Sequence, residues 1–138
     1  MGHIFSPRQR TIYAKKICRL LDDKMAQNVH LLKMPQMESL CDYVIIATAT
    51  SGPHLDALER YLRRELKGLG LVLGKPVEGR SSGSWRIVDA GFAVIHMMDE
   101  ASRKRYNLEH IWSETEIVPF LQRKKSSKRR AKKAAGSY

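Results

Sequence analysis

A serine-glycine pair, Ser51-Gly52, follows an apolar, β-branched segment and superficially resembles the start of a nucleotidyltransferase site. Such a site needs two or three carboxylates that hold a divalent metal ion against a triphosphate. The nearest acidic residues are Asp56 and Glu59 just downstream and Asp89 farther along, and no Asp-x-Asp pair stands in a predicted strand. We therefore expect no catalytic residues and no enzymatic activity.

The histidines and cysteines do not have the spacing of a metal site. No two histidines are four residues apart, and none accompanies a pair of cysteines. Glycine-rich phosphate-binding motifs do not occur in the sequence. The two cysteines, Cys18 and Cys41, are too few for a disulfide framework and are expected to be buried free thiols. We expect no metal and no cofactor; the five histidines are His3, His30, His54, His96 and His110.

Aromatic and long apolar side chains are concentrated between Trp85 and Trp112. The strand predicted for residues 92–98 is largely apolar on both faces, since its side chains alternate and only His96 among them is polar. Helices can cover one of these faces, and something else must cover the other. Core packing accounts for Val94 and Ile95. For the Trp, Tyr and Met residues near the strand ends, a partner-binding patch is an equally good explanation, because these residue types are enriched in interfaces.

The net charge of +11 is concentrated at the C-terminus. Residues 123–138 contain eight basic residues and no acidic one, so residues 1–122 carry only +3. A segment this charged cannot bury enough apolar area to fold alone, and we expect a folded domain over 1–122 and a disordered tail over 123–138. The tail should attract phosphate without sequence specificity, although a solubilising role remains an alternative. Its basic residues are Arg123, Lys124, Lys125, Lys128, Arg129, Arg130, Lys132 and Lys133.

The hydrophobic pattern predicts a single compact α/β domain in which helices flank a mixed sheet. Ser6 and Pro7 are typical of a helix start, and Gly68 and Gly70 of a helix end. The short turn at 89–91 predicts a hairpin. Helices are expected over about 7–23, 51–68, 100–106, 108–112 and 114–121, and strands over 28–34, 42–50, 71–77, 84–90 and 92–98.

Two further features bear on where the protein acts. No apolar run approaches the ~20 residues of a membrane span, and the N-terminus does not have the apolar core of a signal peptide. A domain of about 120 residues can bury a sufficient core without disulfides. We therefore expect a cytoplasmic protein that does not associate with membranes.

Several segments together resemble one protein family, the ribosomal silencing factor family, which is also called the Iojap-like family. The match spans about residues 10–113, and its motifs occur in a fixed order along the chain. They are the segments CDYVIIATATSGPHLDAL at 41–58 and RKRYNLEHIW at 103–112, with Glu78-Gly79, Trp85, Asp89, Gly91 and His96 between them.

This resemblance implies a fold, a partner and a mode of action. Members of the family have a nucleotidyltransferase-like topology without the catalytic groups. They bind ribosomal protein fourteen of the large ribosomal subunit on the face that would meet the small subunit. By occupying that face they block subunit joining and repress translation under nutrient limitation, and organellar relatives assist large-subunit assembly. The resemblance leaves open whether the free protein is a monomer or a homodimer.

With the resemblance in view, we expect one side of the sheet to dock on the ribosomal protein and the basic tail to contact nearby ribosomal RNA. Two alternatives remain from other functional classes. One is a large-subunit assembly factor or general RNA-binding protein that acts through its tail, and the other is an active nucleotidyltransferase. The expected partner-binding residues are Trp85, Asp89 and His96 on the sheet and Arg103, Tyr106, Glu109 and Trp112 along the adjoining edge.

Overall fold

The computed structural model describes residues 5–34, 41–71, 73, 76–80, 83–111 and 116–120, and within them it confirms an α/β domain with a mixed sheet. Its elements are, in chain order, α1 (Pro7–Asp23), β1 (Gln27–Lys33), β2 (Tyr43–Ala49), α2 (Gly52–Gly68), β3 (Trp85–Asp89), β4 (Ala93–Asp99), α3 (Glu100–Tyr106), α4 (Leu108–Ile111) and β5 (Glu116–Ile117).

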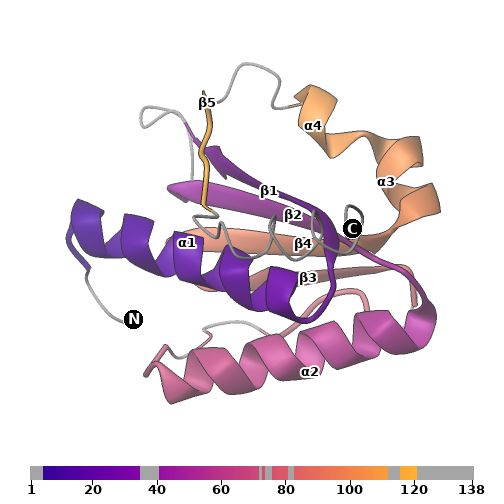
Figure 1. Ribbon diagram of the computed structural model, residues 1–138, viewed down its shortest axis with the longest axis horizontal. Coiled ribbons are helices and arrows are strands. Elements are labelled where there is room, and N and C mark those ends of the chain that lie inside the picture. The colour runs from indigo at the N-terminus through magenta and orange to yellow at the C-terminus, as the bar shows by residue number, and fades with distance from the viewer. Residues whose placement is uncertain are drawn as a thin grey trace, which may run out of the picture.

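The strands form one sheet in the order β3-β4-β2-β1-β5 (Figure 1). The central pair β2 and β4 is parallel, whereas β1 with β2, β3 with β4 and β1 with β5 are antiparallel. All seven residues of β2 are buried, as expected for a central strand whose sequence is apolar on both faces. The hairpin predicted at residues 89–91 is confirmed by the antiparallel pairing of β3 and β4.

Helices α1 and α2 cover one face of the sheet, and their sequences explain where they begin and which side they bury. Ser6 caps α1 in a reciprocal capping box with Gln9, and the Ser51 hydroxyl accepts from the backbone N–H of His54 at the start of α2. The apolar stripe of α2 is fully buried against the sheet. This stripe consists of Leu55, Leu58, Leu62 and Leu66.

The shorter helices α3 and α4 lie on the other side of the sheet, away from α2 (Figure 1). Leu108 of α4 packs there in a smaller apolar cluster with buried residues of β1, β2 and β4. Asp99 caps α3 by accepting from the backbone N–H of Ser102, and α3 ends at Asn107 in the left-handed conformation. The buried members of this cluster are Leu32, Val44, Ile46, Met98 and Leu108.

Two sequence predictions about secondary structure are wrong. The helix expected at 114–121 is instead, in its described part, the two-residue strand β5, which pairs with the open edge of β1 and is followed by Pro119. The strand expected at 71–77 does not form at its described positions, where Pro76 lacks the N–H that a ladder needs. Only an isolated bridge between Glu78 and Ile87 extends the sheet beyond β3 in this described region.

Two smaller expectations concern thiols and membranes. Cys18 is buried in α1 and Cys41 is half-buried, and both are free cysteines. Burial raises the pKa of the Cys18 thiol, so it stays protonated at neutral pH. Across the described residues, none of the helices combines the length and hydrophobicity needed to cross a bilayer.

Candidate functional site

Three side chains on the face opposite α1 and α2 form a compact group, here called the aromatic cluster: Trp85, His96 and Tyr106. Strands β3 and β4 place Trp85 and His96 on the same face, since Ile87 pairs with His96 and side chains alternate along each strand. The Trp85 ring centroid lies 5.9 Å from that of His96 and 4.8 Å from that of Tyr106. The structure therefore brings together three of the residues that the sequence analysis selected.

The aromatic cluster is partly open to solvent. Tyr106, in the last turn of α3, is 47% exposed, Trp85 is half-buried, and His96 is buried beneath them. Aromatic side chains that are held rigidly and still exposed can contribute strongly to an interface, since little conformational entropy remains to be lost on binding. Ile87 and Val94, which the sequence analysis did not select, are half-buried on the same face. Side chains alternate along a strand, so Ile87, two residues after Trp85, and Val94, two residues before His96, could have been predicted on this face from the sequence.

His96 is held in its neutral form by its surroundings. Burial lowers its pKa to about 4, so the imidazole carries no charge at neutral pH. The indole Nε1–H of Trp85 donates to His96 Nδ1 at 3.1 Å, which requires the proton of the neutral ring to be on Nε2. The cluster therefore presents an uncharged aromatic surface, and His96 acts as a structural support for Trp85.

Arg103 lies beneath this face, with its guanidinium directed into the protein. It is 9% exposed and donates to the backbone oxygen of Asn28 at 2.6 Å and to the Thr48 hydroxyl at 2.8 Å. A further contact joins it to Nδ1 of His30 at 3.1 Å. Asn28 adopts a positive φ at an irregularity in β1, which turns its carbonyl toward Arg103. Arg103 thus fixes α3 on the sheet.

The other predicted partner-binding residues have different positions. Asp89 ends β3 and is half-buried, and its Oδ1 accepts from the backbone N–H of Gly91 in the hairpin turn. Glu109 lies in α4, but its side chain is outside the described structure. Trp112 and the basic residues from Arg123 onward also lie outside the described residues.

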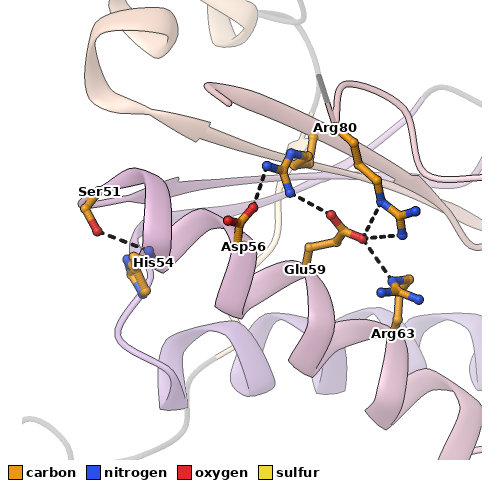
Figure 2. A network of polar contacts seen from close by, with 7 residues as sticks. Ser51, His54, Asp56, Glu59, Arg63 and Arg80 are labelled. Atoms are coloured by element: carbon orange, nitrogen blue, oxygen red, sulfur yellow. Dashed lines mark hydrogen bonds and ion pairs between the residues drawn. The ribbon is translucent and has the colours of Figure 1, made fainter. Parts of the chain in front are cut away.

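A second polar group occupies the opposite face of β3, and Figure 2 shows it. Glu59 on α2 is buried and accepts from Arg86 on β3 at 2.7 Å, from Arg80 at 2.6 Å and from Arg63 at 3.0 Å. Arg86 is also buried and donates to Asp56 at 2.6 Å. This Glu59 network ties α2 to β3, the strand that carries Trp85 on its other face.

The Glu59 network engages two of the three carboxylates considered for an enzymatic site, Asp56 and Glu59. Burial by itself would raise the pKa of Glu59, but hydrogen bonds from Arg80 and Arg86 and the nearby charges hold it below its ordinary value. Three guanidinium groups already fill the acceptor sites of this carboxylate, so little remains for a divalent cation. No cluster of three or more His, Cys, Asp or Glu residues suited to metal binding occurs in the described part of the chain.

The Ser51-Gly52 segment is likewise explained by local structure. The backbone N–H of Thr50 donates to Nδ1 of His54 at 2.9 Å, and Nε2 of the same ring donates to the backbone oxygen of Lys24 at 2.8 Å. Both ring nitrogens are therefore used to join the start of α2 to the end of α1. Ser51 is a helix cap in this arrangement.

Gly79 explains one of the sequence motifs. Its φ is +91°, and a Cβ at this position would overlap the backbone oxygen of Trp85. Its neighbour Glu78 exchanges two backbone hydrogen bonds of 3.0 Å with Ile87. The Glu78-Gly79 pair therefore packs backbone against backbone on the outer edge of β3, next to Trp85, and only glycine fits there.

Comparison with known proteins gives a consistent picture. Residues 7–137 match the sequence profile of a family described as "Ribosomal silencing factor during starvation". A ribosomal silencing factor of Chromobacterium violaceum is 33% identical over 100 residues, which are 72% of this chain and 80% of that protein. One of Bacillus subtilis is 29% identical over 97 residues, which are 70% of this chain and 81% of that protein.

An organellar protein and two solved structures are also similar. The mouse protein named "Mitochondrial assembly of ribosomal large subunit protein 1" is 32% identical over 96 residues, 68% of this chain and 42% of its own length. A crystal structure from Chromobacterium violaceum has a TM-score of 0.68 at 28% identity and covers 85% of this chain and 93% of its own. A crystal structure from Bacillus halodurans has a TM-score of 0.66 at 27% identity. The match covers 80% of this chain and 98% of that chain.

Proposed function

Because this chain belongs to the ribosomal silencing factor family, we propose that it binds the large ribosomal subunit through ribosomal protein fourteen and blocks the small subunit sterically. The names of the family and its relatives indicate a ribosome-associated regulatory factor rather than an enzyme. Steric exclusion requires no reaction chemistry. A specific interface of about 800 Å² on each partner is sufficient for such a mechanism.

The aromatic cluster is the observation that carries this proposal. It is an uncharged and partly exposed surface on the face of the sheet opposite α1 and α2. Trp and Tyr side chains of this kind often account for most of the binding energy of an interface. In the proposed complex Trp85, Tyr106 and Asp89, which lies at the far end of β3, contact the ribosomal protein. His96 and Arg103 hold Trp85 and α3 in place.

Substitution of the exposed member of the cluster tests the proposal. Tyr106→Ala removes a side chain that is 47% exposed, so the fold should survive and binding to purified large subunits should weaken about 30-fold, as for a hot-spot residue. Ile12→Ala is a matched control, since Ile12 is 50% exposed but lies on α1. Equal binding by folded Tyr106→Ala and Ile12→Ala proteins would remove the aromatic cluster from the interface.

Assembly of the large subunit is a second candidate function, favoured by the name of the mouse relative. The same docking surface could serve both functions if the protein binds before the subunit is complete. Depletion of the protein distinguishes the two. Incomplete large subunits would accumulate during growth if assembly dominates, whereas mature subunits would associate excessively under starvation if silencing dominates.

A further inference from the structure

The outward face of α2 carries a dense row of cationic side chains. Positions 60, 63, 64 and 67 are all Arg or Lys, and this spacing places them on one side of a helix. The opposite side is the buried leucine stripe. Arg60, Arg64 and Lys67 are exposed, and Glu65 is the one acidic residue between 60 and 67.

The Glu59 network adds a fifth cation to this row. Arg80, from the segment before β3, approaches Glu59 Oε2 at 2.6 Å, and Arg63 approaches the same oxygen at 3.0 Å. Figure 2 shows the two arginines converging on this carboxylate from different parts of the chain. The side chains of Arg80 and Arg63 remain 53% and 40% exposed, and each guanidinium has N–H donors beyond those that Glu59 accepts. Glu59 and Asp56 supply two negative charges against the three guanidinium groups of Arg63, Arg80 and Arg86, so the network keeps a net positive charge.

We infer that this basic face, formed by Arg60, Arg63, Arg64, Lys67 and Arg80, binds the phosphate backbone of RNA. Four of its five members are arginines, whose planar guanidinium matches the oxygens of a phosphate. A membrane surface is a poor match, because the apolar side that an interfacial helix would insert is already buried in the core. An RNA backbone supplies closely spaced negative charges and needs no apolar contact.

The segment that precedes the basic tail reaches the α1 side of the sheet. Phe120, the last described residue, packs against the main core, and its backbone oxygen accepts from Arg19 of α1 at 2.8 Å. The eight cations of the tail follow it in sequence and lie outside the described residues. The aromatic cluster occupies the opposite side of the sheet. One face can thus hold a protein while the other contacts RNA.

Two matched double variants of the full-length protein test this inference with a short fluorescent RNA duplex as the probe. Arg60→Gln/Lys67→Gln removes two charges from the basic face. Lys104→Gln/Arg105→Gln removes the same two residue types from exposed positions on α3. Glutamine is a good helix former, so both proteins should fold, which circular dichroism checks. Affinity is measured from low to high salt.

The α2 variant should bind the duplex about tenfold more weakly at low salt, and its plot of log affinity against log salt should be shallower by about two. The α3 variant should keep the slope of the unaltered protein. Equal losses in the two variants would mean that the tail and the overall charge account for binding, and would overturn the inference. Binding of polyglutamate as tight as that of the duplex, and equally sensitive to the α2 changes, would also overturn it in favour of an acidic protein partner.

Discussion

The indole N–H of Trp85 donates to Nδ1 of His96 at 3.1 Å, across the antiparallel pair β3 and β4. The Trp85 indole is half-buried and a partner can reach it. The neutral imidazole of His96 is buried beneath it. The bond between them can form only while His96 is unprotonated at Nδ1. The shape of the proposed docking surface is therefore linked to the protonation state of a buried residue.

The stability of the protein should fall as the pH decreases from about 6.5 to 4. The unfolded chain takes up a proton on His96 near its ordinary pKa of 6.5, whereas the folded protein does so only near 4. Acid therefore favours the unfolded state, by at most about 3 kcal/mol. Urea unfolding across this pH range measures the effect. His96→Gln should show a flatter pH dependence, and identical pH profiles for the two proteins would contradict the proposed role of His96.

Replacement of Glu59 by Gln should destabilise the protein by about 3 kcal/mol, because it leaves the buried Arg86 without its main counter-charge. Thermal and denaturant unfolding measure this loss. Glu65→Gln, on the same helix but at a more exposed position, is the control and should change stability by less than about 1 kcal/mol. If the two substitutions cost the same, the Glu59 network is not a significant source of stability.

A methyl group at position 79 should displace the backbone beside Trp85. Gly79→Ala combines a positive φ with an overlap on the Trp85 carbonyl, and we expect a loss of about 2 kcal/mol or more together with altered tryptophan fluorescence. Gly52→Ala is the matched control, because nothing lies within 4 Å of its Cβ position. An unchanged fluorescence spectrum in Gly79→Ala would show that this contact does not position Trp85.

Removal of residues 123–138 should weaken binding to large subunits mainly at low salt. The deletion takes away eight positive charges and no negative one, so the salt dependence of binding should become much shallower. Sedimentation at a series of potassium concentrations measures both quantities. The same affinity and the same slope with and without the tail would exclude a contact between the tail and ribosomal RNA.

Local sequence patterns predicted the long elements correctly. The leucine spacing of α2, the Ser6-Pro7 start of α1 and the tight turn after Asp89 each depend on nearby residues, and all three predictions are confirmed. The mixed sheet was also predicted, although the pairing of the strands was not, apart from the β3–β4 hairpin. Which strands pair depends on contacts between distant segments, about which short-range periodicity carries no information.

The errors and omissions have the same physical origin. Residues 116–117 join the sheet because β1 offers an open edge, and no local signal reveals that edge. Arg103 was predicted to contact the partner, and no local pattern reveals the three groups of β1 and β2 that its buried guanidinium contacts. The Glu59 network joins residues 21 and 27 positions apart, so no short motif in the sequence predicts it.

Centrifugation of mixed ribosomal subunits tests the central claim most directly. Purified large subunits are incubated with the full-length protein, small subunits are added, and the particles are separated on a sucrose gradient. We predict that the protein migrates with the large subunit and that joined particles decrease as the protein is added, with Tyr106→Ala much less effective. Joined particles that form normally while the protein remains at the top of the gradient would contradict the account.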